Sequence, residues 1–169
     1  MKALRGIACI TAVVFLGMGV ASCGPEAGQL NPKQTSAPPS ECAHFLPEAP
    51  CGRYASIAGS ENGQEIPWVT AGEVTAELSK RGADTHLSVV MPCGPLDAVV
   101  TIDGKIMRLT GQRALGASGC VEGQGERQDW ILKLLERGVE LGYNNTLTLT
   151  NGGDSLSFAH PGTMPASPR

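Results

Sequence analysis

The chain has 169 residues, 13 Lys and Arg against 16 Asp and Glu, a formal net charge of −3, and 4% aromatic residues. An acidic chain without a basic cluster is a poor candidate for binding nucleic acid, so no nucleic-acid partner is expected. The length suits one domain with its own core.

The first 22 residues have the composition of a secretory signal peptide. Lys2 and Arg5 precede an apolar run over residues 7–20, and no acidic residue occurs among them. This run is shorter than the ~20 apolar residues that span a bilayer comfortably. We therefore interpret residues 1–22 as a signal peptide that is removed on export. Its removal would reduce the 13 basic side chains to 11 against 16 acidic ones.

The small residues in Val20-Ala21-Ser22, directly before Cys23, resemble the lipobox of bacterial lipoproteins. In that motif the cysteine thiol takes acyl chains such as palmitate and becomes the mature N-terminus. Each buried CH₂ group contributes about 0.8 kcal/mol, so two or three acyl chains anchor a protein stably. The resemblance implies lipidation at Cys23 and a location on the extracytoplasmic side of the cell membrane. The alternative is an ordinary secretory signal in which Cys23 is incidental.

Four further cysteines follow the signal: Cys42, Cys51, Cys93 and Cys120. An even number of cysteines in an exported chain indicates two disulfides, and four cysteines allow three pairings. We favour Cys42–Cys51 and Cys93–Cys120, because each bond closes a local loop. A zinc site is the competing interpretation, but the spacings contain no C-x₂-C pair.

Two segments without apolar periodicity flank the rest of the chain. Residues 23–41 contain four prolines and almost no apolar side chains, which predicts a disordered tether behind the lipidated cysteine. Residues 161–169 are similar and are predicted to be a disordered tail. The globular domain is therefore expected to span residues 42–160.

Within that domain, apolar residues recur at every second position, which is the period of half-buried strands. The alternation predicts strands over residues 52–58, 74–78, 87–91, 96–102, 105–110, 146–150 and 154–158. Between them stand turns with a Gly or Asn that tolerates positive φ, as tight hairpins require. These turns are Arg81-Gly82, Asp103-Gly104, Asn144-Asn145 and Asn151-Gly152-Gly153.

Residues 126–137 instead have the period of a helix. Asp129 and Lys133 have the spacing of an i,i+4 ion pair, and Gly138 can end the helix. The apolar residues that share one helical face are Trp130, Ile131, Leu134 and Leu135. The pattern as a whole predicts an α+β fold, a curved antiparallel β-sheet of short hairpin-connected strands with one helix covering its open end or face.

Several motifs occur in a recognisable order. They are Gly52-Arg53-Tyr54 in the opening strand, Met91-Pro92-Cys93-Gly94 at a strand end, the Asp103-Gly104 hairpin, Cys120 before the helix, and the closing Leu147-Thr148-Leu149 and Leu156-Ser157-Phe158. This order resembles the META domain family, which includes the HslJ-type bacterial lipoproteins. The family typically has Gly-Cys-Asn where this chain has Pro92-Cys93-Gly94. The resemblance implies a META-like domain in the cell envelope and does not imply a defined reaction.

No catalytic signature stands out in the sequence. His44, His86 and His160 are not spaced as metal ligands, and no Gly-x-Ser-x-Gly elbow occurs. Asp97 alternates with apolar neighbours and is expected to face solvent. The glycine-rich residues 111–125 are expected to form a surface loop pinned by Cys120. We therefore expect no catalytic residues, no metal and no cofactor.

Two functions remain open. The first is a non-catalytic binding or envelope-maintenance module that contacts an envelope protein or a small hydrophobic ligand, through an exposed apolar patch or a cavity in the curved sheet. The alternative is a hydrolase acting on cell-envelope material, which needs a nucleophile and a base within about 3 Å of each other in a cleft.

Overall fold

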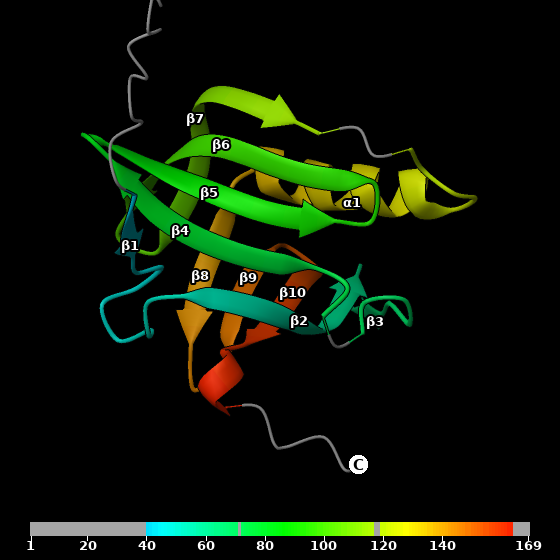
Figure 1. Ribbon diagram of the computed structural model, residues 1–169. Helices are drawn as coiled ribbons and strands as arrows, with labels where there is room; N and C mark the ends of the chain where they lie inside the picture. Colours follow the sequence, from blue (N-terminus) through cyan, green and yellow to red (C-terminus); the bar gives the residue numbers. More distant parts are fainter. Residues whose placement is uncertain (1–39, 71, 117–118, 164–169) are drawn as a thin grey trace, which may run out of the picture. The chain divides into compact units, whose positions relative to one another are not determined.

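A computed structural model describes residues 40–70, 72–116 and 119–163, which belong to one compact unit spanning residues 37–169 (Figure 1). The predicted signal peptide, Cys23 and nearly all of the predicted tether lie outside the described residues, as do residues 164–169. None of the helices in the described segments has the length and apolar character needed to cross a bilayer.

The described chain consists of ten strands, one α-helix and one short 3-10 helix. The strands are β1 (Glu41–Ala43), β2 (Arg53–Glu61), β3 (Gln64–Glu65), β4 (Thr75–Arg81), β5 (Asp84–Met91), β6 (Gly94–Asp103), β7 (Ile106–Leu115), β8 (Val139–Tyr143), β9 (Leu147–Asn151) and β10 (Asp154–Ala159). The helix α1 (Gln124–Glu136) lies between β7 and β8, and the 3-10 helix η1 (Pro161–Thr163) follows β10. The predicted domain boundaries thus differ slightly from the folded elements, since β1 begins at Glu41 and η1 extends past residue 160.

The sheet is antiparallel throughout and closes on itself. Its strands follow the order β1-β4-β5-β6-β7-β8-β9-β10-β2-β3, and β2 pairs in addition with β4. Eight strands, β2 and β4 to β10, therefore form a barrel. The prediction of a curved antiparallel sheet with one helix is confirmed in outline, but the closure of this sheet into a barrel was not predicted. Strand twist and two irregularities of register, in β2–β10 and in β6–β7, allow the sheet to coil until its edges meet.

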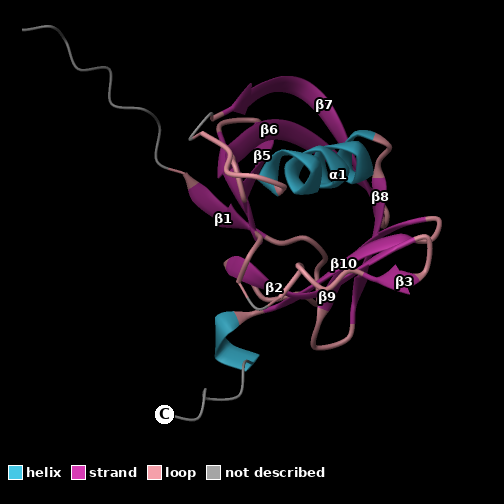
Figure 2. Cartoon of the chain, turned by 90° about the vertical axis from the view of Figure 1, so that its right-hand side faces the viewer, coloured by secondary structure: helices cyan, strands magenta, loops and turns pink. Residues whose placement is uncertain are grey.

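One seam of the barrel is held by few backbone pairs. β7 pairs with β8 only at Ile106 and Met107, whereas β5 and β6 form seven consecutive pairs. Figure 2 shows α1 lying across the opening between β5–β7 and β8–β10. Arg113 of β7 forms an ion pair with Glu136 of α1 beside this seam. The helix therefore covers the part of the barrel where the ladder stops.

The interior is filled by aliphatic and aromatic side chains from every strand of the barrel. The largest fully buried ones are Phe45, Tyr54, Leu78, Leu87, Leu96, Met107, Ile131, Leu134, Leu141, Leu147, Leu149, Leu156 and Phe158. They belong to one continuous cluster. Burial of a single such side chain stabilises the fold by roughly 1.5–3 kcal/mol.

The helix confirms the predicted apolar face. Ile131, Leu134 and Leu135 are buried and Trp130 is partly buried, while Lys133 is exposed. Gly138 has φ 77°, and its N–H donates to the carbonyl of Leu135, so it ends the helix as predicted. The ion pair predicted between Asp129 and Lys133 is not among those that the described residues form.

The two disulfides join the predicted partners. Cys42–Cys51 connects β1 to the start of β2, and these two strands share one edge of β4, with β1 at residues 78–80 and β2 at residues 75–77. Cys93–Cys120 connects the β5–β6 turn to the segment before α1. The buried Gln128 of α1 strengthens that second connection, because its side-chain carbonyl accepts a hydrogen bond from the N–H of Cys93 at 3.1 Å.

Candidate functional site

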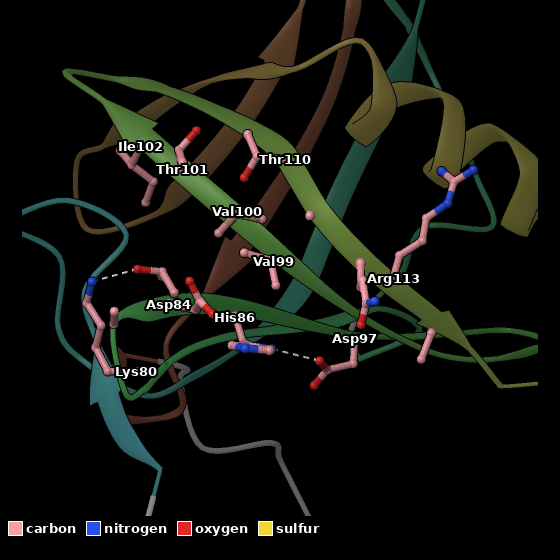
Figure 3. A pocket seen from close by; sticks show the side chains of 15 residues that line it. Lys80, Asp84, His86, Asp97, Val99, Val100, Thr101, Ile102, Thr110 and Arg113 are labelled. Atoms are coloured by element: carbon pink, nitrogen blue, oxygen red, sulfur yellow. Dashed lines mark hydrogen bonds and ion pairs between the residues drawn. The ribbon is translucent and has the colours of Figure 1, made fainter. Parts of the chain in front are cut away.

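An open groove of about 900 Å³ lies over β5, β6 and β7 (Figure 3). We call it the outer groove, because its charged and hydroxyl side chains come mostly from the outward-facing positions of these strands. Its lining includes His86, Asp97, Val99, Thr101 and Arg113. The alternate residues Leu87, Leu96 and Ala98 point into the barrel and are buried. The same strands therefore supply both the core and the groove.

A bulge in β7 shapes the middle of the outer groove. Between Ala98 and Val100 of β6 there is one residue, whereas the opposed stretch of β7 contains Thr110, Gly111 and Gln112. A Cβ atom on Gly111 would lie 2.7 Å from the Cβ of Val99, so only glycine permits this approach. The predicted surface loop over residues 111–125 is therefore wrong for residues 111–115, which continue β7.

A charged cluster stands at one end of the outer groove. Arg81 donates two hydrogen bonds to Asp97, from Nη1 at 3.2 Å and from Nη2 at 2.8 Å. The Nδ1 atom of His86 lies 2.9 Å from Oδ1 of the same carboxylate and donates to it (Figure 3). Asp97 points away from the core as predicted, but it is ion-paired instead of simply solvated. A bidentate guanidinium clamp fixes both oxygens of the carboxylate.

The electrostatics of the cluster favour the charged carboxylate. Partial burial opposes ionisation, but the hydrogen bonds from His86 and Arg81, with the positive charge of Arg81, outweigh it and lower the pKa of Asp97 below its usual value. The Arg81 and Asp97 side chains are 41% and 33% exposed. Exposed pairs of this kind contribute only about 0–1 kcal/mol to stability. The cluster thus orients polar groups at the surface more than it stabilises the fold.

The opposite end of the outer groove adjoins the first disulfide loop. A second hollow of about 540 Å³ shares Lys80, Thr85 and Ile102 with the groove, and residues 42–47 complete its wall. Lys80 Nζ donates to Thr85 Oγ1 at 2.7 Å, and Nδ1 of His44 donates to the carbonyl of Ala49 at 2.7 Å. The groove therefore adjoins β1 and the segment that follows it.

The remaining residues singled out in the sequence are not assembled into a site. Cys23 lies outside the described residues, and the four disulfide cysteines stand in two separate bonds. His160 packs against the Tyr54 ring, and His44 is hydrogen-bonded to the carbonyl of Ala49 within the first disulfide loop. The three histidines therefore do not form a cluster. In the described segments, no three His, Cys, Asp or Glu side chains are grouped as metal ligands.

The sequence reasoning missed the partners of Asp97. Arg81 and His86 were not connected with it, although the alternation of β5 and β6 places His86 and Asp97 on the same face. The missing information was the register of the hairpin, in which Met91 pairs with Gly94 and Ser88 with Asp97. That register brings His86 to a diagonal position beside Asp97.

Comparisons with known proteins provide little further information. No protein-family model matches the chain, and no curated protein matches it. A solution structure described only as the NMR structure of a protein aligns with 20% sequence identity and a TM-score of 0.45. The alignment covers 63% of this chain and 86% of that one.

Proposed function

We propose that this protein is a membrane-anchored bacterial envelope lipoprotein whose META-like barrel is a non-catalytic binding module. Lipid on Cys23 holds it to the membrane, and the outer groove contacts another envelope protein. The observation that carries the proposal is the outer groove itself, a hollow of about 900 Å³ whose polar cluster adds little to stability.

The arrangement of the cysteines supports export and lipidation. All four cysteines of the described segments are used in disulfides, which are typical of oxidising compartments. Cys23 has no such partner among them and stands in the lipobox-like Val20-Ala21-Ser22-Cys23. The order of elements also supports the META-like assignment, since β2, the Cys93 turn, the Asp103-Gly104 hairpin, Cys120, α1, β9 and β10 follow one another as in that family.

The filled interior favours a ligand on the outside. A small hydrophobic ligand would need space between the inner faces of the strands, and every barrel strand contributes buried side chains to one continuous core there. The outer groove offers ion-paired and hydroxyl groups together with Val99 and Ile102. Mixed polar and apolar surfaces of this kind are usual where proteins contact proteins. We therefore propose an envelope protein as the partner instead of a small hydrophobic ligand.

The hydrolase remains the alternative function. A His–Asp pair is half of a hydrolytic triad, and His86 and Asp97 have the required contact. Among the described residues, the His86 ring contacts the side chains of Asp97 and Arg81, and no serine, threonine or cysteine side chain is hydrogen-bonded to it as an activated nucleophile would be. This arrangement supports the binding module over the hydrolase.

Lipidation is tested by substituting the predicted acceptor. Cys23→Ser should abolish the incorporation of a labelled fatty acid and release the protein from the membrane fraction. Cys9→Ser, which changes a cysteine inside the predicted signal peptide, is the matched control and should leave labelling intact. Label retained in Cys23→Ser would contradict the lipoprotein assignment.

Binding in the outer groove is tested by photo-crosslinking in intact cells. A photoreactive amino acid at Thr101, which is exposed in the groove, should give a discrete adduct with an envelope protein. The same probe at Glu140, exposed on β8, is the control and should give none. Identical adducts from both positions, or none from Thr101, would refute the groove as the binding site.

A further inference from the structure

Both tryptophans of the chain line another hollow, beside the start of α1. Trp68 belongs to the segment between β3 and β4, and Trp130 belongs to α1. Their ring centroids are 5.9 Å apart and their planes make an angle of 88°. The hollow has a volume of about 450 Å³ and also contains Ile66. We call it the tryptophan groove.

Both tryptophan side chains pack against the core of the barrel. The N–H of Val69 donates to the carbonyl of Ile66, and Val69 is buried against Gly59 of β2, which holds the Trp68 segment to the barrel. Trp130 precedes Ile131, which is fully buried in the core. A site whose aromatic side chains are already held in place loses little conformational freedom on binding.

The indole N–H of Trp130 has an unusual environment. Its Nε1 atom is buried and has no hydrogen-bond partner among the described residues. Buried donors without an acceptor are rare in folded proteins, and such a group needs an explanation. The ring that carries this unpaired donor lines the tryptophan groove, and the described part of the fold supplies no acceptor for it.

The rim of the tryptophan groove carries both signs of charge in equal number. The lining includes the acidic residues Glu61 and Glu126 and the basic residues Arg127 and Lys133. The side chains of Glu61, Glu126 and Lys133 take part in none of the ion pairs that join the described residues, so their charged groups are available to a ligand. Arg127 lies over the Trp68 ring, with its Cζ atom 5.5 Å from the ring centroid.

This combination restricts the chemistry of the ligand. A cation would compete with Arg127 for the Trp68 face, and an anion would meet two carboxylates. A wholly apolar ligand would strip water from four charged groups without replacing it. An uncharged sugar ring fits all these features, because its C–H face can pack on an indole while its hydroxyls both donate to carboxylates and accept from cations.

The hollow also continues along α1. An adjoining cavity of about 450 Å³ shares Glu61, Trp130 and Lys133 with the tryptophan groove and extends to Arg137 and Asp154. Each of the two hollows, at about 450 Å³, falls within the range of roughly 300–1,000 Å³ that is usual for small-molecule sites. We propose that the tryptophan groove is a binding site for an uncharged oligosaccharide, separate from the outer groove and independent of the lipid anchor.

The test uses the intrinsic fluorescence of the full chain, purified in a polyoxyethylene detergent that contains no sugar. Since both tryptophans of the chain lie in this groove, the emission reports on this site alone. Titration with the β-1,4-linked tetramer of N-acetylglucosamine, and with the corresponding glucose tetramer, should give a saturable change for at least one of them. The expected Kd is on the order of 0.1–1 mM.

Rim variants localise the binding. Arg127→Ala and Glu61→Gln should each weaken the saccharide affinity about tenfold, since each removes a charged hydrogen-bonding group. Arg53→Ala, which removes an exposed arginine of β2 paired with Glu77, is the matched control and should leave the affinity unchanged. Circular dichroism would show that each variant remains folded.

Three results would overturn the proposal. One is the absence of any saturable change with either tetramer up to about 10 mM, far above the expected Kd. Another is binding that Arg127→Ala and Glu61→Gln leave intact. The third is a saturable response to choline or laurate with none to the tetramers, which would assign the tryptophan groove to a cation or an apolar ligand.

Discussion

The inner and outer faces of β5 and β6 differ in composition and in what they do. On the inner face, Leu87, Val89 and Leu96 are buried among other apolar side chains. On the outer face, His86 and Asp97 form a polar cluster with Arg81 at the end of the outer groove. Alternation along a strand thus separates the residues that stabilise the barrel from those available for binding. Substitutions on the two faces should therefore have different consequences.

The largest effect is expected where α1 packs on the core. Leu134 is fully buried, and truncation of such a side chain costs about 2–5 kcal/mol. Leu134→Ala should lower the free energy of unfolding of residues 37–169 by that amount in a denaturant melt. A change below about 1 kcal/mol would mean that the helix is detached from the barrel, since only surface substitutions are usually so mild.

The second largest loss of stability is expected on removal of Cys93–Cys120, the disulfide that holds the segment before α1. Cys93–Cys120 spans 27 residues and Cys42–Cys51 spans 9. In the chain-entropy account the longer loop stabilises more, about 3–4 kcal/mol against about 2–3. Replacing both cysteines of each pair by serine should reproduce this order in thermal melts. The reverse order would show that the Cys93 turn adds little to the attachment of the helix.

A smaller effect should appear at acid pH through Asp154, which joins α1 to the hairpin ends. Hydrogen bonds from Arg137 and from the backbone N–H of Asn62 lower the pKa of this carboxyl. Its stabilisation is present above the unfolded-state pKa of about 4 and is lost as the pH falls through the lower folded-state value.

Asp154→Asn should therefore destabilise the protein at pH 7 by about 1–2 kcal/mol, since Arg137 is half exposed to solvent. The difference from the unsubstituted chain should shrink below about pH 4. Urea melts at pH 7, 5 and 3 would measure it. A difference that stays constant with pH would rule out the ionised pair as its cause.

The smallest effect is expected at Lys133, which is next to Leu134 in sequence but exposed. Lys133→Ala should change the free energy of unfolding by less than about 1 kcal/mol, because it removes neither core packing nor an observed ion pair. The same melt used for Leu134→Ala would measure this. Similar losses for the two substitutions would remove the distinction between the buried and exposed faces of α1.

The sequence predicted most of the elements because their apolar periods are strong. Leu96, Ala98 and Val100 alternate with outward residues in β6, and the face of α1 is read directly from Ile131, Leu134 and Leu135. The hairpin turns were also correct, since Gly82, Gly104, Asn145 and Gly152 all have positive φ.

β1, β8 and the second half of β7 were not predicted. β8 contains Gly142, a poor strand residue, yet a Cβ atom there would lie 2.6 Å from Thr148 Oγ1 on the paired strand. β7 from Thr110 onward is exposed on both faces, so no alternation marks it. The three residues of β1 are too few to show a period.

The candidate site was harder to predict than the fold, because it depends on register. The outer groove combines β5, β6 and a bulge in β7, and the pairing of Arg81 with Asp97 crosses from the end of β4. In the tryptophan groove, Trp68 contacts Trp130, which lies 62 positions further along the chain. The folding of the barrel brings the two residues together. Local patterns carry no information on either juxtaposition.

The most direct test of the proposed outer groove separates binding from stability at Asp97. With the photoreactive probe at Thr101, Asp97→Asn should reduce the yield of the envelope-protein adduct about tenfold, because the charged partner of Arg81 and His86 is lost. The free energy of unfolding should change by no more than about 1 kcal/mol. An unchanged adduct yield in this folded variant would contradict the assignment of binding to the outer groove.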